Sequence, residues 1–338
     1  MTSLVQQFAT NFDHVRQINL ETIRGFHTTH VLIALIKVGF FTELRQFQKV
    51  NLPEFARRQN LDLKILTSLC EYLYSIQILQ HEGDTYFLDE KGVLIDNLMT
   101  GPLLVVHAYE NVFHNLEALL RKQKKFGSDV NRLSEFVAGG SGTVGKSFAF
   151  PLMINFLRQG RYQCVLDLAC GDATFLAALC QENENMRAYG LDIAPEAIEL
   201  GNCVLARTGL QDRVQLLVED MFNLDKTTHL FQGVDAVTCI HALHEFLEDG
   251  NERVISMLQK YKARFPGVPL VILEVIRPPL EELRERPGGM IDILLFHDLS
   301  GQALTSRESW QALFQQAGFT NVKEDYFPTV RTAIYTLC

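Results

Sequence analysis

Two histidines and one acid in this chain have the residue types of a shared catalytic or metal-binding site. His244 and Glu245 follow an apolar run, and His297 lies in a later apolar segment. Two imidazoles and one carboxylate on one side of a pocket can hold a transition metal ion and leave coordination positions open for a chelating substrate. Because His244 and Glu245 are adjacent, that use requires irregular backbone after Leu243. His297 could instead be a hydrogen-bonded pocket histidine, and His241 is expected to be buried or to support the site.

A short turn between an expected strand and an expected helix is a second candidate site. The apolar residues 165–168 precede a turn of small residues that contains Gly171, and the helical run 175–180 follows. Small residues let a ligand approach the backbone at a helix N-terminus. A dinucleotide fingerprint would need three glycines, and Asp167 has the wrong charge for a diphosphate. It suits the sulfonium and ammonium groups of S-adenosylmethionine, so this turn favours that cofactor over a generic Rossmann crossover.

Acids also stand at the ends of the next expected strands. Asp192 ends the second strand, where a carboxylate can accept hydrogen bonds from both ribose hydroxyls. Asp220 ends the third strand and is expected to bind the adenine amino group, with Met221 against the ring. Ligands of such sheets bind beyond the carboxyl ends of the strands, which is where these acids and the histidines fall.

The elements that position these residues alternate between strands and helices. Helices are expected around 195–208 and 251–263, and the strands are expected at 165–168, 187–193, 214–222, 234–243 and 270–276. This alternation predicts a doubly wound, Rossmann-like α/β domain over residues 161–338.

The first hundred residues have a different pattern, helix–helix–helix–hairpin, which is typical of a winged helix. The helices are expected at 26–44, 52–58 and 61–79, and the hairpin at 80–88. The third helix begins with one lysine against two acids, too little positive charge to neutralise DNA phosphates. We therefore predict a winged-helix-like domain over 1–100 that does not bind DNA.

Residues 101–160 are expected to connect the two domains and cover the substrate. Helices are predicted at about 101–122 and 143–159, joined by a polar linker over 121–142.

Together these motifs resemble the class I S-adenosylmethionine-dependent methyltransferases, specifically the small-molecule O-methyltransferases that include acetylserotonin and caffeate enzymes. That family has an acid-rich glycine turn, a ribose acid, a D-M-F segment and an H-D-W segment, which match 167–173, Asp192, 220–222 and 244–246 in order. This chain departs from the pattern with Ala169 and Ala173 in place of glycines and with H-E-F in place of H-D-W. The resemblance implies that residues 1–100 form an intertwined dimerisation module, so a homodimer is expected.

The resemblance leaves two chemistries open. In the O-methyltransferases the histidine of H-D-W is the general base, so His244 would take a hydroxyl proton without a metal and His297 would be a pocket wall. The similar 2-oxo acid C-methyltransferases act on phenylpyruvate or on the 2-oxo acid derived from arginine, 5-guanidino-2-oxopentanoate. They have a His-Asp pair after the fourth strand and a later histidine that hold an iron-type metal. His244, Glu245 and His297 fit that spacing, with Glu in place of Asp.

Methylation of carbon needs a carbanion, and a metal ion bound by the carboxylate and keto oxygens of a 2-oxo acid would stabilise the enolate. We therefore expect metal-assisted C-methylation at the β-carbon, with metal-independent O-methylation as the alternative. Arg121 and Arg307 are candidates to hold the substrate carboxylate, although each residue is more often found on the surface. A protein that binds the cofactor without turnover is a third interpretation, which the complete set of strand-end acids and histidines disfavours.

The amino-acid composition limits the kinds of partner that this chain is expected to bind. The 338 residues carry a net charge of −9, which argues against nucleic acid or an anionic membrane as the main partner. No apolar run approaches the roughly 18–20 residues of a membrane span, and the N-terminal residues do not resemble a signal peptide. The seven cysteines form no C-x-x-C pair, so they are expected to be reduced thiols in a cytoplasmic protein.

Overall fold

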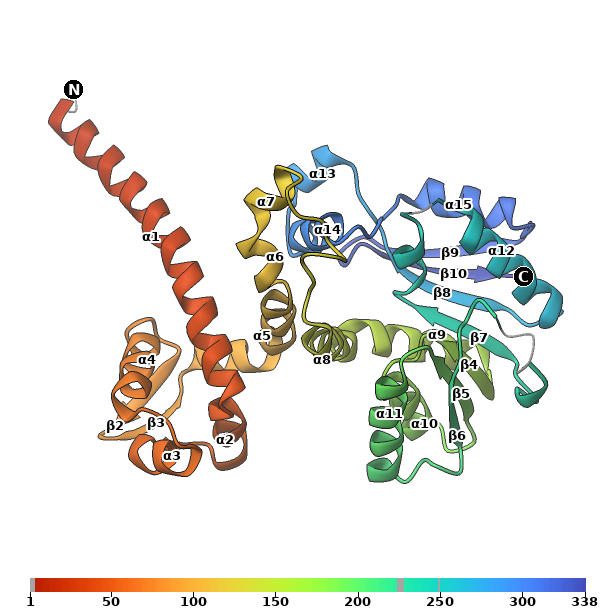
Figure 1. Cartoon of the computed structure of the whole chain (residues 1–338), viewed down its shortest axis with the longest axis horizontal. Coiled ribbons are helices and arrows are strands. Elements are labelled where there is room, and N and C mark those ends of the chain that lie inside the picture. The colour runs from red at the N-terminus through yellow and green to blue at the C-terminus, as the bar shows by residue number, and fades with distance from the viewer. Residues whose placement is uncertain (1–3, 224–227, 249) are drawn as a thin grey trace. The chain divides into compact units, whose positions relative to one another are not determined.

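The computed structural model describes residues 4–223, 228–248 and 250–338, which form two compact units (Figure 1). Unit 1 comprises residues 1–108 and 135–141, and unit 2 comprises residues 109–134 and 142–338. The predicted N-terminal domain therefore lies in unit 1 and the predicted α/β domain in unit 2. The segment expected to connect them is divided between the two units.

Unit 1 has four helices before its hairpin, where the sequence predicted three. Its elements are α1 (Leu4–Lys37), α2 (Phe40–Phe47), β1 (Val50–Asn51), α3 (Leu52–Gln59), α4 (Leu63–Ser75), β2 (Leu79–Glu82), β3 (Thr85–Leu88) and α5 (Glu90–Ala108). The strands form a small antiparallel sheet in the order β1-β3-β2. Apolar side chains of α1 to α4 pack together as its core.

Local signals explain where these helices begin and end. The side chain of Asp62 accepts a hydrogen bond from the backbone N–H of Ile65 and caps α4. The prediction of one helix over 26–44 was wrong, because Gly39 adopts a φ of 82° and separates α1 from α2. The predicted helix over 61–79 ends at Ser75, since Gln77 is also left-handed, with a φ of 62°.

Unit 2 contains one seven-stranded sheet with the order β6-β5-β4-β7-β8-β10-β9. Its strands are β4 (Cys164–Leu168), β5 (Arg187–Asp192), β6 (Val214–Val218), β7 (Ala236–Ile240), β8 (Leu270–Val275), β9 (Val322–Phe327) and β10 (Thr332–Leu337). The first five are parallel, and β10 pairs antiparallel with β8 and β9. The predicted Rossmann-like fold is confirmed, and the two C-terminal strands were not predicted.

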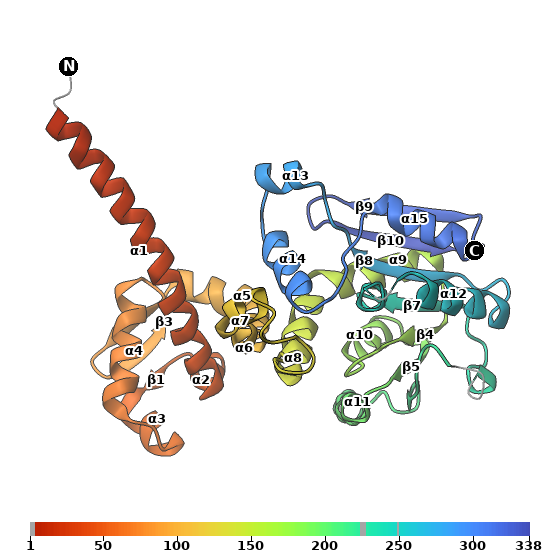
Figure 2. The same cartoon turned by 45° about the horizontal axis from the view of Figure 1, so that its top comes forward.

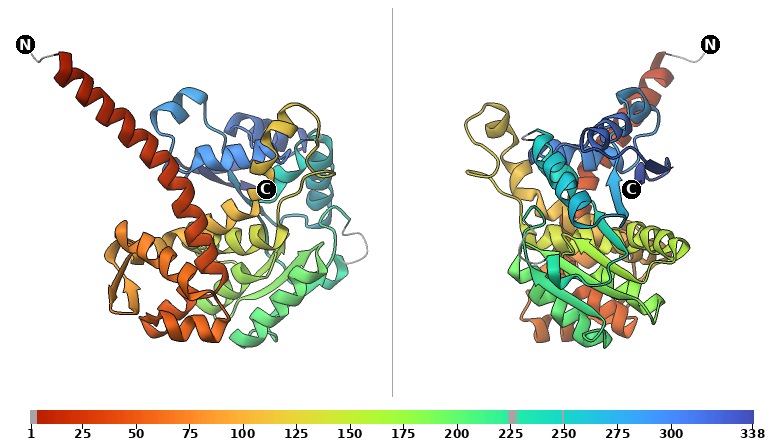
Figure 3. Two further views of the ribbon diagram at one scale, coloured as in Figure 1. Left: turned by 60° about the vertical axis from the view of Figure 1, so that its left-hand side comes forward. Right: turned by 90° about the vertical axis from the view of Figure 1, so that its right-hand side faces the viewer.

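Helices cover both faces of this sheet (Figures 2 and 3). One buried apolar cluster joins the sheet to α9 (Phe150–Gly160), α10 (Thr174–Glu182) and α11 (Pro195–Thr208). A second cluster joins the opposite face to α12 (Glu252–Arg264) and α15 (Arg307–Gln316). Residues of β4 alternate between the two clusters, as expected for a strand buried on both faces. This packing holds the carboxyl ends of the parallel strands at one edge.

Shorter elements complete the chain. They are α6 (Glu110–His114), α7 (Leu116–Leu120), α8 (Ser134–Val144), the π-helical turn η1 (Gly145–Ala149), the 3-10 turns η3 (Thr228–Leu230) and η4 (Leu243–Phe246), α13 (Leu280–Glu285) and α14 (Met290–Leu299). The predicted linker over 121–142 is thus helical from Ser134. The predicted fourth strand over 234–243 stops at Ile240, because His241 has a φ of 50° and turns the backbone out of the sheet.

Two further sequence expectations concern membranes and disulfides. Within the described ranges, no single helix is both long enough and apolar enough to cross a membrane. The helix pair Leu20–Lys37 and Phe40–Phe47, which is bent at the break between its two parts, meets both criteria only when the two parts are taken together. All seven cysteines are free thiols, and five of them are buried.

Candidate active site

The small-residue turn after β4 folds into a tight loop at the sheet edge. Ala169, Gly171 and Ala173 all have left-handed backbone, with φ of 54° to 56°. The two alanines that replace the family's glycines thus keep the glycine-type path at a conformational cost. The loop is held by the backbone N–H of Gly171, which donates to Asp192 Oδ2 at 2.9 Å.

The strand-end acids lie where the sequence predicted. Asp192 ends β5 and also accepts a hydrogen bond from the backbone N–H of Ala194 through Oδ1, at 2.9 Å. Asp220 accepts from the backbone N–H of Phe222 at 2.9 Å, which closes the turn after β6. Met221 is buried beside it. These bonds pre-position the carboxylates and leave further lone pairs on their oxygens.

Asp167 is the buried acid of this edge. It is 3% exposed, and its Oδ1 accepts a hydrogen bond from Thr238 Oγ1 at 2.6 Å. Burial raises the pKa of Asp167 to about 7, with a smaller rise from the charge of Asp192, although the bond from Thr238 opposes the shift. A cation placed here would favour the ionised form.

His244 forms a buried dyad with Glu274, the acid near the end of β8. The imidazole Nδ1 donates to Glu274 Oε2 at 2.7 Å, and Glu274 Oε1 accepts the backbone N–H of Leu243 at 2.9 Å. Burial alone would lower the pKa of His244, but the charge and hydrogen bond of Glu274 raise it above its usual value. With Nδ1 engaged, Nε2 of His244 is the nitrogen available for a proton or a metal ion.

His297 is the second imidazole at this place. It lies on α14, and its ring centroid is 5.0 Å from that of His244. Its Nδ1 donates to the carbonyl oxygen of Ile293 at 2.6 Å, which again leaves Nε2 available. The next residue, Asp298, forms a bidentate ion pair with Arg277, at 2.8 and 3.1 Å. Burial, and next the charge of His244, lower the pKa of His297.

Glu245 is turned to a different set of partners. Its Oε1 accepts from Gln302 Nε2 at 2.7 Å and lies 3.5 Å from Arg132 Nη2. Arg132 Nη1 also donates to Tyr109 Oη at 2.9 Å and to Gln302 Oε1 at 3.2 Å. Burial would lower the pKa of Arg132, but Tyr109 and then Glu245 raise it. A guanidinium therefore stands beside the turn that carries His244.

The donor set fits a metal ion only in part. In the residues that the structure describes, no group of three or more His, Cys, Asp or Glu side chains is arranged to hold one. Of the three expected ligands, the structure brings the rings of His244 and His297 together, whereas Gln302 and Arg132 hold the Glu245 carboxylate. The pair itself has the usual orientation of metal-binding histidines, with Nδ1 donating to a carboxylate or carbonyl and Nε2 free.

Sequence reasoning missed Glu274 and Arg132, which contact His244 and Glu245. Glu274 interrupts an otherwise apolar strand, and that interruption was a usable signal. Arg132 lies in an irregular segment, so no pattern marked it. Arg121 forms an exposed pair with Glu117, and Arg307 on α15 pairs with Glu324, so each expected arginine is occupied elsewhere.

Comparisons with known proteins agree with this geometry. A family described as "Methyltransferase domain" matches residues 165–263, which cover β4 to α12. The chain is 27% identical over 310 residues to the 2-ketoarginine methyltransferase of Streptomyces arginensis, covering 88% of this chain and 87% of that protein. This chain is an S-adenosylmethionine-dependent methyltransferase.

Two solved structures share the fold of this methyltransferase. One is the mitomycin 7-O-methyltransferase MmcR, with a TM-score of 0.70 and 18% identity, covering 98% of this chain and 99% of that chain. The other is human N-acetylserotonin methyltransferase in complex with S-adenosylmethionine, with a TM-score of 0.69 and 13% identity, covering 96% of this chain and 97% of that chain. The methyltransferase thus resembles small-molecule O-methyltransferases along its whole length.

Proposed function

We propose that this methyltransferase transfers the methyl group of S-adenosylmethionine to the β-carbon of a 2-oxo acid such as 5-guanidino-2-oxopentanoate or phenylpyruvate, with a metal ion held by His244 and His297. The observation that carries the proposal is the pair of imidazoles with 5.0 Å between ring centroids, both anchored through Nδ1. The similarity to a 2-ketoarginine methyltransferase supports the same substrate class.

The β-proton of a 2-oxo acid is too weakly acidic to leave quickly at neutral pH. A bound transition metal ion with open coordination positions would supply Lewis-acid stabilisation of the charge that develops on the two oxygens of the substrate. Glu274 accepts the Nδ1–H of His244, so the neutral imidazole is the tautomer with its lone pair on Nε2. The α14 backbone does the same for His297 through Ile293. The chain's part in the transfer itself is positioning, with the β-carbon in line with the sulfonium.

Arg132 is the proposed partner of the substrate carboxylate. Its guanidinium is held by Tyr109 and Gln302, so it is oriented before the substrate arrives. The Glu245 carboxylate, 3.5 Å away, occupies the place that a substrate carboxylate would take. We propose that the Glu245 side chain moves away from Arg132 when the substrate binds. The substrate carboxylate would then replace the Glu245 carboxylate as the anion beside Arg132.

For the cofactor, we propose that Asp192 accepts from the ribose hydroxyls and that Asp220 and Met221 bind adenine. Asp167 and the Gly171 turn would then face the methionine part, whose ammonium and sulfonium are cationic. Their placement at the carboxyl ends of β4, β5 and β6 supports this assignment.

The His244–Glu274 dyad also favours an alternative, metal-independent O-methylation of a small hydroxylated metabolite. A carboxylate that holds Nδ1–H of an imidazole makes Nε2 a competent general base. In that case His297 is a wall of the pocket.

Removal of bound metal by a chelator distinguishes metal-assisted C-methylation from metal-independent O-methylation. The full-length enzyme would be dialysed against a strong chelator, assayed with 2-oxo acids and with phenols, and reloaded with divalent or ferric ions. His297→Ala should lose bound metal and activity together, because one histidine holds the ion poorly. His114→Ala is the matched control, since His114 also donates Nδ1 to the carbonyl four residues earlier, at 2.8 Å, but is exposed.

If His244 is only a base, chelation should leave activity unchanged and His297→Ala should be mild. Full activity after exhaustive chelation, with no metal detected in the protein, would refute the C-methylation proposal and leave O-methylation standing.

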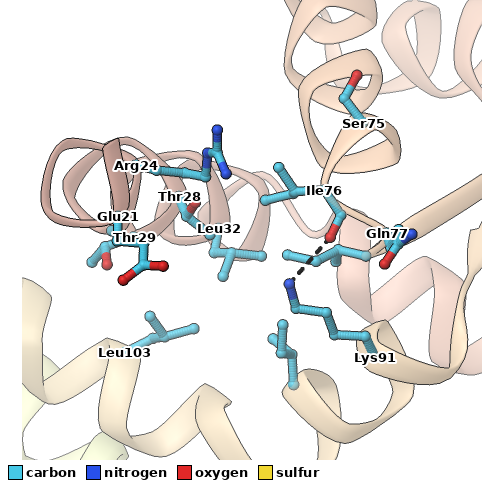
Figure 4. Close-up of a pocket in the computed structure, with 13 residues that line it drawn as sticks. Glu21, Arg24, Thr28, Thr29, Leu32, Ser75, Ile76, Gln77, Lys91 and Leu103 are labelled. Atoms are coloured by element: carbon cyan, nitrogen blue, oxygen red, sulfur yellow. Dashed lines mark hydrogen bonds between the residues drawn. The ribbon is translucent and has the colours of Figure 1, made fainter. Parts of the chain in front are cut away.

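We also propose that the enzyme is a homodimer joined through unit 1. A cavity of about 580 Å³ lies between α1, the end of α4 and α5, lined by Leu32, Ile76 and Leu103 among others (Figure 4). On the same helix α1, Leu20, Ile23 and Phe26 are exposed. The cavity is also lined by Glu21, Arg24 and Lys91. Exposed apolar side chains next to this cavity suit contact with a second copy of the chain. Sedimentation at micromolar concentration should give a dimer, and a monomer would refute this proposal.

A further inference from the structure

His241 has a left-handed backbone conformation, which is uncommon for any residue other than glycine. It follows the last residue of β7 and has a φ of 50°. Its backbone N–H donates to the carbonyl oxygen of Leu273 at 2.8 Å, so β8 holds the residue in this conformation. Strained residues of this kind cluster at sites that bind ligands.

The side chain of His241 is a second unfavourable feature, because one of its ring nitrogens is buried without a hydrogen bond in the described part of the chain. Its Nε2 is shielded from solvent and has no hydrogen-bond partner among the described residues, although the residue as a whole is partly exposed. Buried nitrogens of native proteins are nearly always paired, so an orphan calls for an explanation. Besides burial, the charges of Glu274, His244 and His297 influence the pKa of His241, and these are groups of the candidate active site.

The segment beside His241 is irregular as well. The ring of Phe148 lies next to the imidazole, with 6.1 Å between centroids. Phe148 belongs to the π-helical turn η1, between α8 and α9. Single π-helical turns inside helices occur frequently at functional sites, because the extra residue re-aims a side chain. Strain, an unpaired nitrogen and a π-turn therefore meet at one residue at the ligand-binding edge of the sheet.

We infer that His241 is a substrate-contacting residue whose imidazole hydrogen-bonds an oxygen at the reacting end of the methyl acceptor. The methyl acceptor has to bind next to His244 and His297. His241 precedes His244 by three residues in the sequence, and both follow the end of the same strand, β7. Binding of an oxygen would pair the orphaned nitrogen, with Phe148 as the neighbour that moves aside. The inference holds for a 2-oxo acid and for a phenol, so it does not depend on which chemistry is correct.

The test uses the full-length enzyme with His241→Asn and His241→Gly, both of which accept left-handed backbone. The acceptor is the 2-oxo acid or phenol that the unaltered enzyme methylates. We expect kcat/KM for the acceptor to fall at least about tenfold, which is the effect of one lost hydrogen bond to the substrate. S-adenosylmethionine affinity in calorimetry should stay within about twofold, and the Tm should change by less than about 3 °C.

Arg161→Gly is the matched control, because Arg161 is also left-handed, with a φ of 60°, but is exposed at the end of α9. It should leave acceptor kinetics unchanged. Acceptor kcat/KM within twofold of the unaltered enzyme would overturn the inference, and so would an equal loss of S-adenosylmethionine affinity. Unfolding of both His241 variants would overturn it too, because His241 would then be a residue that the fold requires.

Discussion

Replacing Glu274 with glutamine tests the core of the site with a nearly isosteric change. Glu274 is fully buried, and its two oxygens accept from His244 Nδ1 and from the backbone N–H of Leu243. Glutamine can still accept from Leu243 through its carbonyl oxygen, but its amide group then faces His244 as a donor. Nδ1 of His244 would become the acceptor, and the proton would move to Nε2.

The expected loss of transition-state stabilisation is that of one charge-assisted hydrogen bond, about 1.5–3 kcal/mol. If it is lost from the transition state, kcat falls by roughly 10- to 150-fold. The pKa of His244 should also fall, because the charge of Glu274 is what raises it against burial. Both a base and a metal ligand need an unprotonated Nε2, so this loss is expected for either chemistry.

Steady-state kinetics with saturating S-adenosylmethionine would measure kcat, and calorimetry would measure cofactor affinity. Glu324→Gln is the control, since Glu324 lies in the same sheet but pairs with Arg307. If Glu274→Gln keeps full kcat while folded, the dyad is structural and the assignment of His244 to the reaction is refuted.

Three further predictions concern the cofactor edge. Asp192→Ala should weaken S-adenosylmethionine binding by roughly ten- to a hundredfold, through unmade hydrogen bonds of about 1–3 kcal/mol; unchanged affinity in calorimetry would remove Asp192 from the site. Folding raises the pKa of Asp167 from about 4 in an unfolded chain to about 7, so the ligand-free protein should lose about 2–3 kcal/mol of unfolding free energy as the pH rises from 5 to 8. Urea unfolding of Asp167→Asn should lack this part of the pH dependence, and an identical slope would contradict it. Ala169→Gly should raise the unfolding free energy by about 1 kcal/mol, because the position is left-handed; a lower Tm would contradict that account.

The positions of the acids at the ends of β4, β5 and β6 could be predicted from the sequence because the signals for them are local. An apolar run followed by small residues predicts a strand and a turn, and parallel strands bring their carboxyl ends to one edge. Asp167, Asp192 and Asp220 could therefore be assigned to one edge of the sheet without any knowledge of distant contacts. The N-terminal helices were predicted less well. Residues 4–25 were not predicted to be helical, the break at the left-handed Gly39 was missed, and the helix predicted over 61–79 ends at Ser75.

The contacts around His244 and Glu245 could not be predicted in the same way, because they join distant segments of the chain. Arg132 reaches Glu245 from a segment without regular structure, and no pattern encodes that approach. The direction of Glu245 depends on the 3-10 turn η4, which points adjacent side chains apart. Periodicity alone also could not show that His241, rather than Leu243, begins the irregular backbone.

The central claim is methylation of carbon in a 2-oxo acid, and the identity of the product tests it most directly. The full-length enzyme would be incubated with S-adenosylmethionine carrying a ¹³C-labelled methyl group and with 5-guanidino-2-oxopentanoate or phenylpyruvate, and the product examined by ¹³C and ¹H NMR. We predict a carbon-bound methyl group whose protons couple to a single proton on the β-carbon. A methoxy signal, or no transfer to either 2-oxo acid alongside transfer to a phenol, would contradict the proposal.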